Sequence, residues 1–168
     1  MNPKPLVFVD LDDTLFQTHR KQQPTPLHKI ATTDVSGQPL SYKNPKQQVF
    51  VNWLLETTEI IPVTARSVEG FKRVQIPFHH GAICSHGGTI LNKDNQVDTE
   101  WLDLKIQINQ SLKLVLHEVE SVLHDFVKEA DLSSLRTWTL AENDLEIYAV
   151  AKQNDPTTLV LDQLVQQI

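Results

Sequence analysis

The chain has 168 residues, which suits one medium domain or one domain with part of a second, and a chain this long can bury a sizeable core. Hydrophobic residues make up 40% of it and charged residues 21%, a composition typical of a globular protein and not of a disordered or fibrous one. The formal net charge of -6 argues against a nucleic-acid partner, because binding a phosphate backbone needs clustered Lys and Arg.

Cysteine usage and the N-terminal residues bear on the compartment. Cys84 is the only cysteine, which excludes an intramolecular disulfide and a thiolate zinc site and fits a reducing cytosol. The segment Met1–Pro5 has no long apolar stretch, and no window approaches a membrane span. We therefore expect a cytoplasmic protein without membrane association, and the sequence leaves its oligomeric state open.

The first predicted elements are a strand, a flap and a helix. Leu6–Val9 is a short β-rich apolar run, as expected of a strand buried on both faces of a parallel sheet. The polar stretch at about 16–45 contains several breakers and predicts a small flap or hairpin, with its tip at 36–38. Asn44 and Pro45 then begin a helix as N-cap and first residue. Its predicted apolar face consists of Val49, Phe50, Trp53 and Leu54.

Further strands and helices alternate up to about residue 101. Ile60–Val63 is a second buried-strand candidate, although Pro62 can donate no ladder hydrogen bond. Ser67 can cap a short helix that runs to Arg73. A third strand is predicted at 82–85, and 89–101 resembles a hairpin turning at 93–95. This alternation predicts an open α/β sheet.

The remainder of the chain has a different pattern. Ile106–Val127 predicts a long amphipathic helix, and Leu135–Leu140 and Leu145–Ala151 predict two strands. A final helix is expected at 157–166. We predict a core domain at 1–103, which includes the flap, and a smaller α+β domain at 104–168.

The strongest chemical signal is the run Asp10-Leu11-Asp12-Asp13-Thr14-Leu15, directly after the first strand. Ligands of open α/β sheets bind beyond the carboxyl ends of the strands, where this run lies. Two crowded carboxylates repel each other unless a cation lies between them, and Mg²⁺ prefers oxygen ligands. A carboxylate can also attack phosphorus to form an aspartyl-phosphate. The alternative is a solvated acidic turn with a helix cap.

These six residues resemble the first motif of the haloacid dehalogenase-like (HAD) superfamily. The resemblance implies a Rossmann-like parallel-sheet core with a smaller α+β cap. It also implies that Asp10 is the nucleophile, that Asp12 is the general acid and base, and that Mg²⁺ contacts the Asp10 side chain and the Asp12 backbone carbonyl. An aspartate at the second position is typical of the phosphatases and phosphomutases of the superfamily. Asp13 is expected to support the loop.

A second motif, Thr64-Ala65-Arg66, ends the second strand candidate. A hydroxyl, a backbone N–H and a guanidinium at a strand end can hold a phosphoryl group. The motif resembles the second HAD motif, usually Thr-Gly-Arg in the sugar-phosphate branch, and the resemblance implies that Thr64, Ala65 and Arg66 bind phosphate. Ala65 departs from the usual glycine. Alternatively, Thr64 caps the following helix and Arg66 lies on the surface.

The third motif is Ser85-His86-Gly87-Gly88. It resembles the Ser-Asn-Gly-Gly stretch of the branch that contains sucrose-phosphate phosphatases, which makes Gly87 and Gly88 candidates for substrate binding. A plain turn explains the two glycines equally well. The adjacent histidines at 79–80 are expected to be exposed, not metal ligands, and Cys84 is expected to be a buried small hydrophobe.

Together the motifs predict a Mg²⁺-dependent phosphatase that hydrolyses a small phosphate monoester, a sugar phosphate, through an aspartyl-phosphate. The resemblance also implies a core lysine and a second acidic motif, and neither is found before Ile168. Three explanations remain: the chain is part of a longer protein, which we favour, a partner completes the site, or the fold binds without turnover. A phosphomutase or phosphotransferase is a further alternative.

Overall fold

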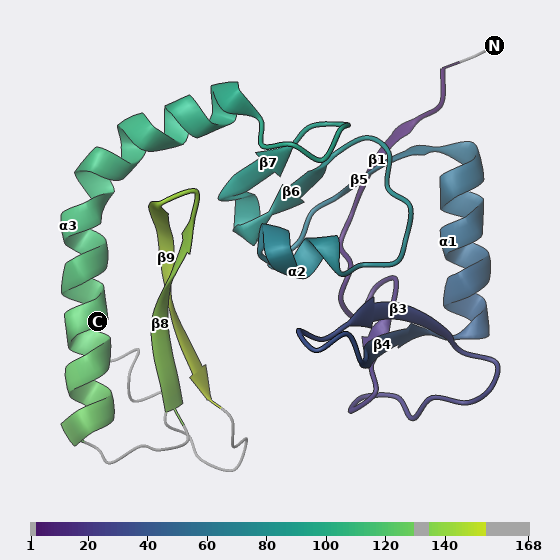
Figure 1. Ribbon diagram of the computed structural model, residues 1–168, viewed down its shortest axis with the longest axis horizontal. Helices are drawn as coiled ribbons and strands as arrows, with labels where there is room; N and C mark the ends of the chain where they lie inside the picture. The colour runs from purple at the N-terminus through teal and green to yellow at the C-terminus, as the bar shows by residue number, and fades with distance from the viewer. Residues whose placement is uncertain (1–2, 130–134, 154–168) are drawn as a thin grey trace. The chain divides into compact units, whose positions relative to one another are not determined.

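A computed structural model describes residues 3–129 and 135–153 (Figure 1). The chain divides into two compact units, Met1–Leu102 and Asp103–Ile168, and each is described by itself. That the second unit is a cap stays a prediction. No helix within the described residues is long and apolar enough to cross a membrane.

The first unit is organised around short strands. β1 (Leu6–Val9) pairs in parallel with β5 (Glu59–Pro62), in the register that sets Leu6 opposite Glu59. β6 (Ala82–Cys84) lies beside the end of β5 through a parallel bridge between Val63 and Ile83. It also pairs antiparallel with β7 (Thr89–Leu91). The predicted α/β class, with parallel strands and helices, is confirmed.

Pro62 is tolerated in β5 because its nitrogen, which carries no hydrogen, faces away from β1. The N–H groups of Glu59 and Val63 donate to Pro5 and Val9 of the β1 segment, at 2.9 Å each. Since successive N–H groups of a strand point to opposite sides, the position of Pro62 points away from β1. The ladder between β1 and β5 therefore loses no hydrogen bond at the proline.

Only one face of β1 is covered by the described residues, which corrects the prediction that both are. Val7 and Val9 pack against the core, whereas the side chains of Leu6 and Phe8 are 51% and 58% exposed. Alternating residues of a strand point to opposite faces, so the two pairs lie on different sides of the sheet. A continuous apolar run does not by itself show that both faces are covered.

The predicted flap is a three-stranded antiparallel sheet. It consists of β2 (Gln17–Thr18), β3 (Lys29–Thr33) and β4 (Pro39–Lys43) in the order β2-β4-β3, and lies beyond the carboxyl end of β1 (Figure 1). At its predicted tip the Asp34 carboxylate accepts hydrogen bonds from the Ser36 hydroxyl, at 2.7 Å, and from the Gln38 N–H, at 2.9 Å. These bonds lower the pKa of Asp34 below its ordinary value of 3.8, because they favour the ionised carboxylate.

α1 (Pro45–Thr57) begins as predicted. The Asn44 side chain accepts from the Gln47 N–H at 2.9 Å, and the Gln47 side chain accepts from the Asn44 N–H at 3.1 Å, which forms a capping box. The predicted apolar face is wrong, since only Leu54 of its four members is buried. The buried stripe is Val51, Leu54 and the partly buried Leu55, which the helical repeat brings to one side. Val49, Phe50 and Trp53 are exposed.

The segment between β5 and β7 follows the predicted order. α2 (Val68–Lys72) is capped by Ser67, whose hydroxyl accepts from the Gly70 N–H at 3.1 Å. β7 pairs with β6, and the predicted turn lies between Asn92 and Gln96. In the predicted hairpin at 89–101, the first strand is expected to pair with the segment after the turn. Instead β7 pairs mainly with β6, and a single bridge joins Leu91 to Val97.

Gly81, just before β6, is expected to be costly to replace with any other residue. Its φ is +89°, and a Cβ there would lie 2.2 Å from the backbone oxygen of Leu91. Gly37 is a matched control, because its φ is +82° but a Cβ would have nothing within 4 Å. Gly37→Ala should lower the free energy of unfolding by about 1 kcal/mol, and Gly81→Ala by about 1–3 kcal/mol more, in urea unfolding. Equal losses would contradict the predicted clash.

The second unit packs one helix against one hairpin. α3 (Thr99–Glu129), which begins in the first unit and is longer than the predicted helix, is followed by β8 (Leu135–Glu142) and β9 (Leu145–Gln153). The two strands are antiparallel and turn at Asn143 and Asp144, both with positive φ. The core of this unit is formed by Leu123, Phe126 and Leu135, with Val119, Val127, Ala149 and Ala151 packed around it. The helix predicted at 157–166 lies outside the described residues.

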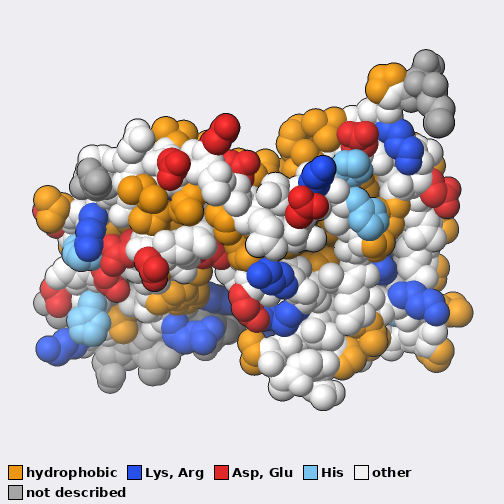
Figure 2. Space-filling model, turned by 45° about the horizontal axis from the view of Figure 1, so that its top comes forward, with side chains coloured by type: hydrophobic (Ala, Val, Ile, Leu, Met, Phe, Trp, Pro, Cys, Tyr) orange, Lys and Arg blue, Asp and Glu red, His pale blue; other side chains and the backbone are white. Residues whose placement is uncertain are grey.

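Figure 2 shows that Lys and Arg side chains are interspersed with Asp and Glu on the face drawn. Exposed apolar side chains lie between them, as on most protein surfaces. In α3 the exposed apolar residues include Leu112, Leu114 and Val115. Among the described residues of α3, those that form the core of the second unit or pack against it lie from Val119 onward.

Candidate active site

The loop after β1 is held by apolar residues and displays polar ones. Leu11, Leu15 and Phe16 are fully buried, and the Leu15 N–H donates to the Leu11 carbonyl at 2.9 Å. Asp13 has a φ of 65°, and its N–H donates to the Phe16 carbonyl at 2.8 Å. The loop therefore turns tightly around buried side chains, while Asp10, just before the first of them, is exposed.

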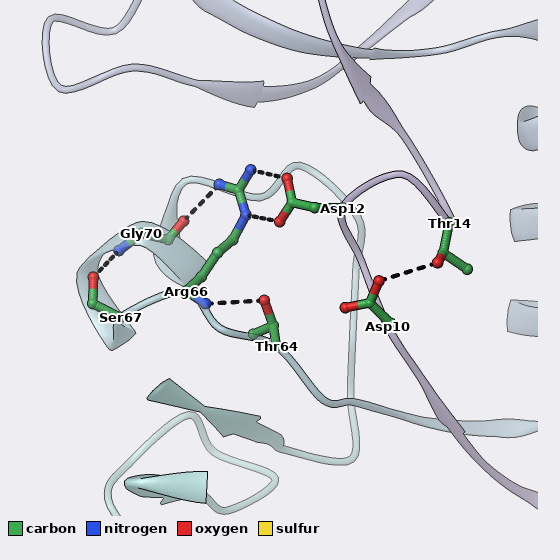
Figure 3. A network of polar contacts seen from close by, with 7 residues as sticks. All are labelled: Asp10, Asp12, Thr14, Thr64, Arg66, Ser67 and Gly70. Atoms are coloured by element: carbon green, nitrogen blue, oxygen red, sulfur yellow. Dashed lines mark hydrogen bonds and ion pairs between the residues drawn. The ribbon is translucent and has the colours of Figure 1, made fainter. Parts of the chain in front are cut away.

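Asp10 lies at the carboxyl end of β1, as predicted. Its Oδ2 accepts a hydrogen bond from the Thr14 hydroxyl at 3.1 Å, which restricts the carboxylate's orientation. The Gln47 side chain donates to the Thr14 carbonyl at 3.3 Å, so the capped start of α1 supports the same loop. The carboxyl groups of Asp10 and Asp12 both point to the side on which Thr64 and Arg66 lie (Figure 3).

Asp13 supports the loop from the flap side. Its carboxylate forms an ion pair with the Lys21 ammonium at 2.5 Å, and both side chains are at least half exposed. A pair this exposed contributes about 0–1 kcal/mol to stability. The geometry fits the supporting role expected for Asp13.

Asp12 and Arg66 form a two-pronged ion pair that the sequence analysis missed. The Arg66 Nε and Nη2 donate to the two carboxylate oxygens of Asp12, at 2.7 Å each (Figure 3). The Arg66 side chain is 15% exposed and the Asp12 side chain 43%. A signal was available, since opposite charges at the carboxyl ends of two adjacent parallel strands are expected to meet.

Thr64 completes the group of predicted residues at this sheet edge. It is 3% exposed, and its hydroxyl oxygen accepts from the Arg66 N–H at 3.1 Å. Its own N–H donates to the Ile83 carbonyl at 2.9 Å, which fixes it at the end of β5. Ala65 lies exposed in the bend between Thr64 and Arg66. The structure thus brings together Asp10, Asp12, Thr64 and Arg66, whose roles toward phosphate stay predictions.

The Gly87-Gly88 pair belongs to the turn between β6 and β7. Gly87 has a φ of +89°, which explains a glycine there, but Gly88 has an ordinary helical φ of -63°. The Gly87 carbonyl accepts from the Trp101 indole N–H at 3.0 Å. Turn geometry therefore accounts for the first glycine and not for the second, and their contact with substrate stays a prediction.

The remaining candidates have ordinary surroundings. His79 and His80 are exposed, and the His80 Nδ1 lies 4.0 Å from a Glu59 carboxylate oxygen. Cys84 is fully buried, as expected of a small hydrophobe. Within the described residues, no group of three or more His, Cys, Asp or Glu side chains could hold a metal ion.

The loop nevertheless offers oxygen ligands of the kind that Mg²⁺ uses. Mg²⁺ keeps several waters and is commonly bound by one or two carboxylates together with substrate phosphates. The exposed Asp10 carboxylate and the Asp12 backbone carbonyl fit this requirement, because neither is taken up by Arg66. The Asp12 side chain, with both oxygens bonded to a guanidinium, does not.

No protein-family model matches the chain, and no curated protein matches it in sequence. Solved structures that resemble it include a trehalose-6-phosphate phosphatase related protein, at 16% identity and a TM-score of 0.41, covering 96% of this chain and 58% of that one. Another is a phosphatase of the haloalkanoate (HAD) superfamily from Bacteroides thetaiotaomicron, at 13% identity and a TM-score of 0.35, covering 98% of this chain and 47% of that one. The chain thus spans about half the length of each.

Proposed function

We propose that this chain carries the nucleophile half of a Mg²⁺-dependent phosphatase that hydrolyses a small phosphate monoester through an aspartyl-phosphate. The observation that carries the proposal is the exposed Asp10 carboxylate at the carboxyl end of a parallel strand, with Asp12 and Thr64 on the same side. Ligands of such sheets bind at this edge. The resemblance of the loop to the first HAD motif supports the same chemistry.

In the first half-reaction Asp10 acts as the nucleophile. One carboxylate oxygen attacks phosphorus, the bond from phosphorus to the substrate oxygen breaks, and an aspartyl-phosphate forms. The departing oxygen takes a proton from the carboxyl group of Asp12 and leaves as an alcohol. The Thr64 hydroxyl and the backbone of Ala65 would orient the phosphoryl oxygens, because they lie at the end of the neighbouring strand β5.

In the second half-reaction the enzyme is regenerated. A water oxygen attacks the phosphorus of the aspartyl-phosphate while Asp12 takes one proton from that water. The bond from phosphorus to the Asp10 oxygen breaks, which releases inorganic phosphate and restores the Asp10 carboxylate. Asp12, now protonated, is ready to act as the acid in the next turnover.

Asp10, through its side chain, and Asp12, through its backbone carbonyl, would hold Mg²⁺ together with the substrate phosphate and water. Bound there, the ion would neutralise the negative charge that otherwise opposes the approach of a carboxylate to a phosphate. A sugar phosphate is the proposed substrate class, on the resemblance of the second and third motifs to the sugar-phosphate branch, and the cytoplasm is the proposed location.

Metal removal tests the proposal. The full-length protein that contains this chain should hydrolyse p-nitrophenyl phosphate, lose nearly all of that activity in excess EDTA, and regain it when Mg²⁺ is added in excess of the chelator. Far-ultraviolet circular dichroism recorded with EDTA should be unchanged, because the described residues contain no cluster of three or more His, Cys, Asp or Glu side chains that would form a structural metal site. Undiminished hydrolysis in EDTA would contradict the metal dependence, and binding of phosphate esters without any turnover would favour a binding domain.

A further inference from the structure

Arg66 makes more contacts within the first unit than an arginine on the surface would. Its guanidinium carbon lies 5.3 Å from the ring centroid of Phe16, which is fully buried. Its Nη1 lies 3.5 Å from the Gly70 carbonyl, and its own carbonyl accepts from the Ser85 N–H at 2.8 Å. These contacts come from the loop, from α2 and from the start of the turn after β6, so they fix both ends of the residue.

The same guanidinium is committed to Asp12. Its two shortest contacts, both 2.7 Å, go to the two oxygens of one carboxylate, and its side chain is only 15% exposed. Little of it is left for a substrate. Asp12, by contrast, is 43% exposed, and each of its oxygens accepts one hydrogen bond from Arg66 while having lone pairs for a second.

We propose that Arg66 is a positioning residue that orients the Asp12 carboxylate toward the water that hydrolyses the aspartyl-phosphate. This inference rests on the proposed function and assigns Arg66 a different role from the phosphate ligand expected from sequence. In this step the water oxygen bonds to phosphorus, its proton passes to the outward side of an Asp12 oxygen, and the bond from phosphorus to Asp10 breaks. Arg66 transfers no atom.

A planar fork suits this role. A carboxylate on a short side chain can rotate about its last bond, and a single donor leaves that rotation open. Two parallel N–H bonds from one rigid plane fix the carboxylate plane as well as its position. At metal sites, removing a partner that orients a metal ligand typically lowers affinity or activity about 10–100-fold, and we expect an effect of the same size for Arg66.

The test separates the two half-reactions of p-nitrophenyl phosphate hydrolysis. Its leaving group needs little help from an acid, so phosphorylation of Asp10 should survive in Arg66→Gln while hydrolysis of the aspartyl-phosphate slows. We expect steady-state kcat to fall about 10–100-fold, with a burst of p-nitrophenol and accumulation of acid-stable phosphoprotein. Arg66→Lys, with one donor group in place of the fork, should fall between wild type and Arg66→Gln.

Arg73→Gln is the matched control, since it removes the same charge from the same unit. The Arg73 side chain pairs with Glu69 on α2 and makes no described contact with Asp12, so its variant should behave as wild type. Thermal unfolding and circular dichroism of all variants report whether a loss of kcat comes from loss of fold.

Each other outcome has a distinct meaning. If Arg66→Gln forms no phosphoprotein and shows a raised KM without a burst, Arg66 binds the phosphoryl group, and the inference is overturned while the proposed function stands. Faster turnover in Arg66→Gln would also overturn the inference, because the ion pair with Arg66 would then hold Asp12 away from its catalytic position. If wild type forms no phosphoprotein and hydrolyses nothing, the proposed function fails and the inference fails with it.

Discussion

Asp10→Asn is expected to lower the turnover of p-nitrophenyl phosphate at least about a thousandfold, since an amide cannot attack phosphorus in place of a carboxylate. The change is nearly isosteric. Its oxygen can still accept from the Thr14 hydroxyl, which lies 3.1 Å from the Asp10 carboxylate, so the loop should keep its conformation. Steady-state kinetics with purified full-length protein provide the measurement.

Asp13→Asn is the control for that experiment. Asp13 lies in the same loop and carries the same charge, but its carboxylate pairs with Lys21 and not with the predicted site residues. It should retain activity within about threefold, because the Asp13 carboxylate pairs with Lys21, and loss of an exposed ion pair lowers stability by at most about 1 kcal/mol. Similar losses in both variants would show that the negative charge of the loop matters and that Asp10 has no special role.

Phe16→Ala is expected to cost about 3–5 kcal/mol of unfolding free energy, the largest effect on stability that we predict. The ring is fully buried, packs in the core with Leu11 and Leu15, and lies under the Arg66 guanidinium. Its removal leaves a cavity beneath the loop that carries Asp10 and Asp12 and beneath Arg66. Urea unfolding followed by circular dichroism measures the change through the shift in midpoint.

Phe8→Ala is the matched control, because it removes the same side chain from a position that is 58% exposed. Its cost should stay within about 1 kcal/mol in the same experiment. A loss as large as that of Phe16→Ala would mean that the outer face of β1 is covered in the protein, for example by another segment or by a second molecule.

Much of the first unit could be predicted from local sequence signals. The cap at Asn44, the cap at Ser67 and the strand at Leu6–Val9 each depend on a few neighbouring residues, and all three are where the sequence places them. Burial could not be read in the same way. Phe50 and Leu6 are exposed although they are apolar, because burial depends on which segments pack there and not on the residue itself.

The site shows the same division between local and distant information. The sequence places Asp10 and Thr64 at strand ends, and the parallel pairing of β1 with β5 brings those ends together. It indicates that Arg66, just after the second strand, lies near Asp12, but it does not show that the two side chains bond to each other. Arg66 is 54 residues away, and its guanidinium can reach Asp12 or point outward to solvent from the same backbone position. Only the packing on Phe16 and the contact near Gly70 select the first arrangement.

The most direct test of the central claim is to locate the covalent phosphate. The full-length protein, mixed with a phosphate ester and Mg²⁺ and quenched in acid, should carry one phosphoryl group. Reduction with borohydride should convert the modified aspartate to homoserine, and peptide sequencing by mass spectrometry should place it at residue 10. Homoserine at another position, or turnover without any trapped phosphoprotein in wild type and in Arg66→Gln, would contradict the account.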